Sequence, residues 1–162
     1  MITYQQARKL LTYNSKTGEL RWRNPVGHQT TGSVGTPDGK GYLQVHIRPR
    51  LYRVHRLIWL WKTGEWPAEQ IDHKNGIRDD NRWCNLRLAN QQQQNWNQKI
   101  YGRKNKTGIK GVFWHEECKG YAAVIHAKGQ KLWLGAYPTP ELAAVAYRQA
   151  AKKYFGEFAR AS

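Results

Sequence analysis

The sequence predicts an α+β protein made of two small basic modules. Its 162 residues are enough for one ordinary domain or two small ones. Segments with the period-two pattern of strands are mixed with segments of helical spacing. A polar, basic stretch poor in large apolar residues, NQKIYGRKNKTG at 97–108, separates them. We therefore predict a first module over 1–97, a linker over 98–106 and a second module over 107–160.

The first module is predicted to mix short helices and strands. Residues 3–13 have the pattern of a short helix. GYLQVHI at 41–47 alternates apolar and polar residues, which is typical of a half-buried strand. LYRVHRLIWLWKTGE at 51–65 begins as a strand and continues with helical spacing. A further helix, rich in Gln and Asn, is expected within 88–98.

The second module is predicted to be a three-stranded antiparallel sheet packed on one helix. Three short segments joined by Gly-containing turns have strand character, at 109–117, 119–130 and 131–139. Thr139 as N-cap and Pro140 at the first helical position begin the helix, and Gly156 ends it.

The charge predicts a polyanionic partner. The chain has 27 Lys and Arg against 11 Asp and Glu, a net charge of +16 that is spread over both modules. Nucleic acid is favoured over a membrane, because no segment has the roughly 18 apolar residues of a spanning helix. Two cysteines are too few for a disulfide framework or a cysteine-rich zinc site. The N-terminus lacks the apolar core of a signal peptide, so we expect a cytoplasmic protein.

Asp72 and His73 stand side by side in the otherwise basic chain. A neutral imidazole can take a proton from water near neutral pH, and a carboxylate can hold a hard divalent cation beside a phosphate. Together these groups suit hydrolysis of a phosphodiester, provided that the local geometry brings both toward one phosphate, since neighbours in a strand point to opposite faces. The alternative is structural: Asp72 caps a turn and His73 fills a polar gap.

Four separated segments of the first module resemble the HNH endonucleases of phage and homing type. They are YRVHRLIW at 52–59, IDHKNGIRDDN at 71–81, NLRLA at 85–89 and the Asn- and Gln-rich run to Asn97. The resemblance implies a ββα-metal fold, in which two strands, a loop and a helix hold one cation. It also implies a metal-dependent endonuclease that cuts duplex DNA.

Carried onto this sequence, the resemblance makes Asp72 a metal ligand and His73 the general base. Asn85 is then the residue that braces the loop and orients the histidine. The second metal ligand falls on Gln94, with Asn95 next to it, where the family has Asn or His. Because Gln is one methylene longer than Asn, three alternatives stay open: Gln94 is the ligand, Asn95 replaces it, or activity is impaired. The expected cation is Mg²⁺, with Mn²⁺ or another divalent ion as the alternative.

Residues 107–160 resemble the Apetala-2 (ethylene-response-factor, AP2/ERF) DNA-binding domain, on GIKGVFW, YAAVI and WLGAYPTPELAAVAYRQAAKKYFGEFA. The resemblance implies that the sheet, and not the helix, faces DNA. Lysine stands in IKGV where the family has arginine, and lysine makes no rigid bidentate contact to guanine, so phosphate contacts are expected there. The predicted DNA-binding residues are Arg56, Arg103, Lys104, Lys106, Lys110, Trp114, Tyr121, His126, Lys128, Lys131 and Trp133.

Two classes of function follow. The first is an HNH endonuclease from a phage or mobile element, acting in the bacterial cytoplasm; one site per chain favours a nicking monomer, while a dimer would allow a double-strand break. The second is a non-catalytic DNA-binding or regulatory protein on an HNH scaffold, which Gln94 supports. Asp72, His73 and Asn85 favour the enzyme, because a pure binding protein has no need of that combination.

Overall fold

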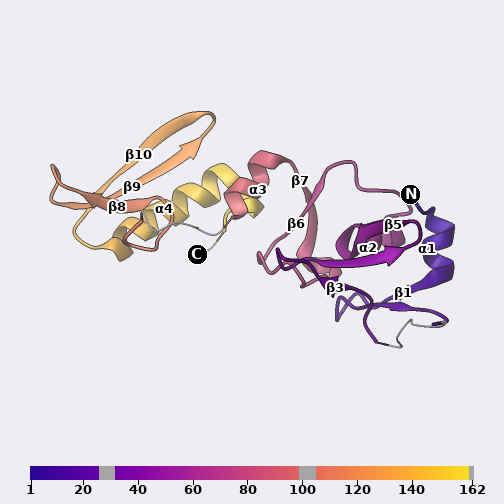
Figure 1. Cartoon of the computed structure of the whole chain (residues 1–162). Helices are drawn as coiled ribbons and strands as arrows, with labels where there is room; N and C mark the ends of the chain where they lie inside the picture. Colours follow the sequence, from indigo (N-terminus) through magenta and orange to yellow (C-terminus); the bar gives the residue numbers. More distant parts are fainter. Residues whose placement is uncertain (26–31, 99–104, 161–162) are drawn as a thin grey trace. The chain divides into compact units, whose positions relative to one another are not determined.

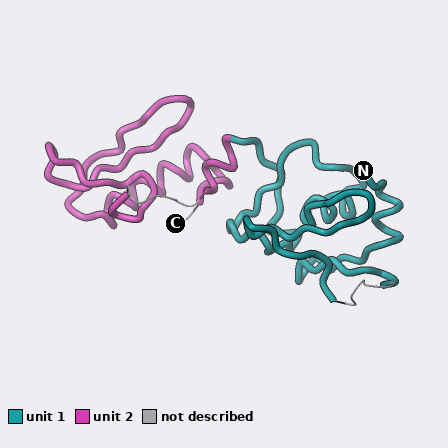
Figure 2. The backbone as a smooth tube through the Cα atoms, viewed as in Figure 1, with its two compact units in different colours: residues 1–91 teal, residues 92–162 magenta. Residues whose placement is uncertain are grey.

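The computed structural model describes residues 1–25, 32–98 and 105–160. The chain divides into two compact units, Met1–Gln91 (unit 1) and Gln92–Ser162 (unit 2), shown in Figure 2. Both units mix helices and strands, which confirms the predicted fold class at that level. Within the described ranges, no helix is long and apolar enough to span a membrane.

Unit 1 begins with helix α1 (Tyr4–Leu10), whose first turn is closed by a capping box between Thr3 and Gln6. The predicted helix was too long, because Leu11–Tyr13 form strand β1 and pair with β2 (Leu20–Trp22). Because the backbone is extended from Leu11 onward, the fully buried Leu11 side chain joins the core of the unit. An extra helical turn would not place this side chain there.

A three-stranded antiparallel sheet follows, with the order β3 (Thr36–Pro37), β4 (Leu43–Ile47) and β5 (Arg50–Arg53). Helix α2 (Val54–Thr63) continues directly from β5, as the change from strand to helix pattern predicted. The helix ends at Gly64, which has the left-handed conformation that glycine adopts at no steric cost.

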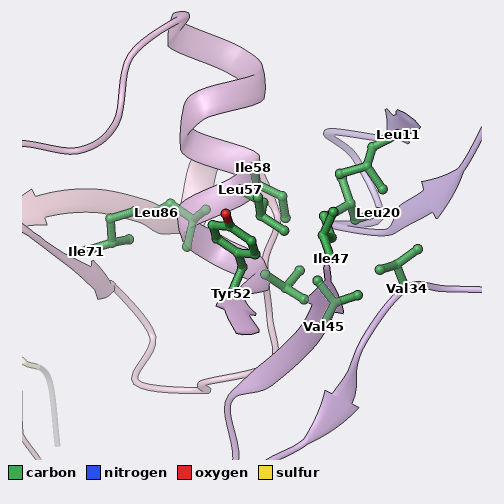
Figure 3. Packing of buried hydrophobic residues seen from close by; sticks show 11 residues of the cluster. Leu11, Leu20, Val34, Val45, Ile47, Tyr52, Leu57, Ile58, Ile71 and Leu86 are labelled. Carbon is green, nitrogen blue, oxygen red and sulfur yellow. The ribbon is translucent and has the colours of Figure 1, made fainter. Parts of the chain in front are cut away.

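One hydrophobic core holds these elements to strands β6 (Gln70–His73) and β7 (Leu86–Ala89), which pair in antiparallel fashion. Figure 3 shows Leu57 and Ile58 of α2 packed among side chains from the sheet, from the β1–β2 hairpin and from β6 and β7. The β6–β7 loop (residues 74–82) and a short 3-10 turn (Trp83–Asn85) join the last two strands. The hairpin and the β6–β7 pair therefore share one core.

Unit 2 begins at the second residue of helix α3 (Gln91–Asn97). The strands β8 (Val112–His115), β9 (Gly120–Ala127) and β10 (Gln130–Tyr137) follow. The sheet order is β10-β9-β8, and every neighbouring pair is antiparallel. Helix α4 (Pro140–Phe155) lies along one face of this sheet (Figure 1). A 3-10 turn, Gly156–Phe158, follows it.

Helix α3 packs within unit 2, so the two units divide at 91/92, whereas the predicted first module extends to 97. Trp96 stacks on Phe155 with the ring centroids 4.5 Å apart. The Nζ of Lys110 donates hydrogen bonds of 2.8–3.2 Å to three carbonyl oxygens at the end of α3, those of Asn95, Trp96 and Gln98. A cation at the carboxyl end of a helix also interacts favourably with the helix dipole.

Replacement of Gly18 by alanine tests how tightly the β1–β2 hairpin meets the β6–β7 loop. Gly18 has φ +81°, and an added Cβ would lie 2.6 Å from the Arg82 nitrogen and 2.7 Å from the Asn81 carbonyl carbon. We expect Gly18→Ala to lower the free energy of unfolding by about 1–3 kcal/mol in chemical denaturation. Gly39→Ala is the control, since no atom lies within 4 Å of its Cβ. Equal stability of the two variants would contradict this packing.

Candidate active site

Asp72 and His73 end strand β6, and the strand places them on opposite faces. Ile71 and His73 are buried, whereas Asp72 between them is half-buried. The pairing with β7 sets Asp72 opposite Arg87 and His73 opposite Leu86. The histidine therefore faces the interior of unit 1, and the carboxylate lies on the other side of the strand pair.

Asp72 forms an ion pair with Arg87, a residue to which sequence reasoning assigned no role. Nε and Nη2 of Arg87 both donate to Oδ2 of Asp72, over 2.9 and 2.7 Å. The two side chains are only 12% and 8% exposed. A largely buried charge requires such a partner, because the ion is otherwise cut off from water. The register of β6 and β7, which sets Arg87 opposite Asp72, is the signal that would have identified Arg87 as the partner of this carboxylate.

His73 is a buried imidazole, 3% exposed. Its Nε2 lies 3.1 Å from Oδ1 of Asn81, and the rings of His55 and Tyr42 pack against it with centroids 5.3 and 5.9 Å away. Burial lowers the pKa of His73 below its ordinary value, although the hydrogen bond to Asn81 and the Asp72 carboxylate act in the opposite direction. The ring is thus neutral near pH 7, the form that accepts a proton.

His55 is a second buried imidazole, in the first turn of α2 and 7% exposed. Its Nδ1 has no hydrogen-bond partner among the described residues. Burial, and after it the neighbouring His73, Arg53 and Arg56, lower the pKa of His55 to about 3. His55 is therefore an uncharged packing partner of His73. Arg56, the predicted phosphate clamp, is half-buried on the next position of the helix.

Asn85 ties the two ends of the β6–β7 loop together. Its Oδ1 accepts a hydrogen bond from the Asn75 nitrogen, while its Nδ2 donates to Oδ1 of Asn75 and to the carbonyl oxygen of Asp80, all within 2.7–3.0 Å. Its own carbonyl oxygen accepts from the Lys74 nitrogen. Asp80 also binds Arg82, which holds the pKa of its carboxyl at about 2. The loop next to His73 is therefore closed at both ends.

The remaining predicted metal ligands, Gln94 and Asn95, lie on α3 and belong to unit 2. Gln94 is half-buried and Asn95 is exposed. The described residues contain no group of three or more His, Cys, Asp or Glu side chains that would hold a metal. The assignment of Asp72 with Gln94 or Asn95 as metal ligands stays a prediction.

The DNA-binding residues predicted in unit 2 do not share one face of the sheet. Cross-strand partners lie on the same face, and His126 pairs with Lys131 while Val124 pairs with the half-exposed Trp133. Period-two alternation joins these residues into one surface, which we call the outer face of unit 2; His115, whose ring contacts Trp133, also belongs to it.

Trp114 and Tyr121 lie on the opposite side, which corrects their assignment to a common surface. They pair with each other across β8 and β9, on the face that buries Val112 and Ile125 against α4. Their rings meet edge to face, 5.1 Å apart, and line a groove together with Pro140 at the start of that helix. Alternation along short strands could not show which of the two faces the helix covers.

The predicted lysine and arginine contacts also differ in position. Lys110 caps α3 with its ammonium group, and desolvation by burial lowers its pKa, so it is a structural residue. Lys106 is exposed, and so is Lys128 in the turn between β9 and β10. Arg103 and Lys104 lie outside the described residues.

Unit 1 has an exposed polar surface that the sequence did not indicate. Val45 and Tyr52 pair on the buried face of the β3–β5 sheet, so His46 and Leu51 pair on the solvent face. Both are exposed, Leu51 to 60%. Arg48, in the turn of the hairpin, is also exposed, and we call the surface formed by Gln44, His46, Arg48 and Leu51 the basic hairpin face.

Comparison with known proteins identifies the domain in which these residues lie. Residues 52–95 match the model of an HNH endonuclease family, a range that contains Asp72, His73, Asn81 and Asn85. The chain therefore carries an HNH endonuclease domain.

A full-length relative is Protein 3.8 of Escherichia phage T7, which is 30% identical over 124 residues, covering 75% of this chain and 97% of that protein. This chain belongs to the family of Protein 3.8. A solved structure titled "DNA binding and cleavage by the HNH homing endonuclease I-HmuI" is 19% identical in sequence. The match covers 89% of this chain and 80% of the chain in that structure, with a TM-score of 0.46.

His55 predicts a loss of stability in acid. Its pKa is about 3 in the folded chain and near 6.5 when unfolded, so its contribution is complete above pH 6.5 and is lost as the pH falls toward 3. His55→Phe should reduce the slope of unfolding free energy against pH in that window by up to about 1.4 kcal/mol per pH unit.

Urea denaturation at a series of pH values measures this slope. His126→Ala, at an exposed histidine of unit 2, is measured in parallel. An unchanged slope in His55→Phe would show that the buried imidazole is not the titrating group.

Proposed function

We propose that this chain is a metal-dependent HNH endonuclease that hydrolyses phosphodiester bonds in duplex DNA. The observation that carries the proposal is His73: a buried, neutral imidazole that follows Asp72 in strand β6 and is fixed by Asn81 and by a closed loop within the HNH domain. Catalysis by a general base depends on this combination of protonation state and fixed orientation.

The residues of the chain divide the work of hydrolysis. His73 takes a proton from the attacking water, and the phosphate is cut to leave 5′-phosphate and 3′-hydroxyl ends. Asn85 keeps the loop closed around the histidine through its bonds to Asn75 and Asp80. Arg87 holds the Asp72 carboxylate in one orientation through two bonds to a single oxygen.

The donor chemistry fits a hard divalent cation such as Mg²⁺. Asp72 offers a carboxylate, and Gln94 or Asn95 offers an amide oxygen, the ligand types that such ions prefer. When bound, the cation supplies charge neutralisation at the phosphate and at the leaving oxygen. The choice between Gln94 and Asn95 stays a prediction, as does the identity of the metal.

Duplex DNA is the proposed partner of both units, with one chain per cleavage site. A two-stranded ribbon fits the major groove, so the basic hairpin face of unit 1 is suited to groove and phosphate contacts. In unit 2 the outer face combines His126, Lys131 and Trp133, which supports an AP2/ERF-like role for the sheet. Lys106 and Lys128 are exposed and available to phosphates.

A non-catalytic DNA-binding protein is the second candidate, and the Asp72–Arg87 ion pair favours it. A guanidinium group that binds a carboxylate competes with a cation for the same charge. Gln94 in place of the usual Asn or His points in the same direction. The two candidates differ in one measurable property, divalent-dependent strand scission.

Cleavage of supercoiled plasmid tests the function. We expect nicking with Mg²⁺ or Mn²⁺ and none with chelator. His73→Ala should lose about 100-fold or more in rate, the usual contribution of a positioned base, yet bind duplex DNA with unchanged affinity. The variant purified in parallel also controls for contaminating nucleases. Equal cleavage by the variant would exclude His73 as the base, and DNA binding without any scission would establish the second candidate.

The two faces of the unit 2 sheet give a matched pair of variants. Trp133→Ala removes a half-exposed ring from the outer face, and Trp114→Ala removes a similarly exposed ring from the α4 side. We expect Trp133→Ala to weaken duplex binding roughly tenfold, as truncation of an interface aromatic does, and Trp114→Ala to leave it within about twofold. Fluorescence anisotropy at one fixed salt concentration measures both. The reverse order would place DNA on the α4 side.

A further inference from the structure

The hydrogen bond between His73 and Asn81 bears on which ring nitrogen accepts the proton. Nε2 of His73 faces Oδ1 of Asn81 at 3.1 Å, and both side chains are buried, with 3% and 1% exposure. A neutral imidazole has one N–H and one lone pair, and an amide oxygen only accepts hydrogen bonds. The hydrogen in this contact therefore belongs to Nε2, and the lone pair lies on Nδ1.

Asn81 is itself held by the β1–β2 hairpin at the start of the chain. The hydroxyl of Tyr13 donates a hydrogen bond of 2.8 Å to the Asn81 carbonyl oxygen across 68 positions of sequence. Burial raises the pKa of Tyr13 to about 12, so the hydroxyl keeps its proton. Gly18 packs on the backbone of the same residue, and the Ser15 carbonyl oxygen accepts a bond from the Trp83 nitrogen.

The side-chain amide nitrogen of Asn81 indicates that this residue is an asparagine because its amide oxygen contacts His73. Its Nδ2 is buried and has no hydrogen-bond partner among the described residues. A buried unpaired donor is costly, and a leucine of similar size would fill the space without it. A residue that served only to pack the loop would not need an amide.

We propose that Asn81, held by Tyr13, is a positioning residue that fixes His73 in the Nε2–H tautomer and makes Nδ1 the proton acceptor. This inference rests on the proposed function. In the step concerned, a water proton passes to Nδ1 and the water oxygen bonds to phosphorus. The bond from phosphorus to the 3′ oxygen breaks, and that oxygen takes a proton from solvent. The imidazolium then returns its proton to solvent.

Asn81→Asp and Asn81→Leu form the decisive pair in the full-length protein. Aspartate keeps an acceptor oxygen toward Nε2, whereas leucine of similar volume has none. In plasmid nicking, Asn81→Leu should lower kcat about 100-fold or more and leave KM within about twofold, while Asn81→Asp stays within about tenfold of wild type in kcat. A loss confined to kcat separates positioning from weakened DNA binding.

The tautomer is measured directly by ¹⁵N NMR of the histidine rings at about pH 9, where imidazoles are neutral. Wild type and Asn81→Asp should show His73 protonated at Nε2 and unprotonated at Nδ1, and Asn81→Leu should lose this preference. The His73→Ala spectrum identifies the resonances.

Tyr13→Phe tests the support of Asn81 from the hairpin. It removes only the bond to the Asn81 carbonyl and should lower kcat several-fold without a change in KM. Tyr137→Phe is its control, since it removes a hydroxyl bond of 3.0 Å to the Leu134 carbonyl in unit 2. This control should nick plasmid at the wild-type rate.

Three results would overturn the proposal: wild-type His73 protonated at Nδ1, wild-type kcat in Asn81→Leu, or an inactive Asn81→Asp that folds normally by circular dichroism. If Asn81→Leu fails to fold, the wild-type tautomer and the Asn81→Asp rate still decide the matter. If wild-type protein cuts no DNA with any divalent metal, the proposed function fails, whereas the tautomer measurement still reports whether Asn81 fixes the ring.

Discussion

The hydrogen bonds of Asn85 hold the β6–β7 loop closed, and the arrangement around His73 depends on them. The amide reaches both ends of the loop, at Asn75 and at Asp80, so the chain between them is confined to a narrow set of conformations. Asn81 follows immediately and meets the His73 ring from inside the unit. The hairpin at the N-terminus closes the loop from the other side, through Tyr13 and Gly18. A free loop would not hold Asn81 against the His73 ring.

The interior of unit 1 carries polar groups that a protein selected for stability alone would replace. His55 and His73 are buried side by side as neutral rings, and the Asp72–Arg87 pair is almost as deeply buried. Burial of such groups costs free energy even when they are paired. Their neighbourhood is apolar, with Ile71 and Leu86 on the same strands. Such a compromise between stability and chemistry is common where catalysis requires low solvent access and perturbed pKa values.

The HNH domain and the compact units divide the chain differently. The family match extends over 52–95, and the boundary between the units lies at 91/92. Helix α3 carries the predicted ligands Gln94 and Asn95, yet its Trp96 and its carboxyl end pack within unit 2. The end of this helix is thus stabilised by contacts within unit 2.

By itself the sequence determined the local features of this protein. Helical spacing located α2, capping residues and a glycine located α4 and its ends, and the motif segments around Asp72, His73 and Asn85 identified the HNH domain. These signals are local, because propensity, capping and side-chain periodicity involve residues a few positions apart.

Only the tertiary structure decided the contacts between distant segments. Strand register set Arg87 against Asp72, and α4 covered the sheet face of Trp114 rather than that of Trp133. The hairpin core turned Leu11–Tyr13 from helix to strand and brought Tyr13 to Asn81. Pairing and packing of this kind depend on the free energy of the whole fold, which outweighs the small differences in local propensity.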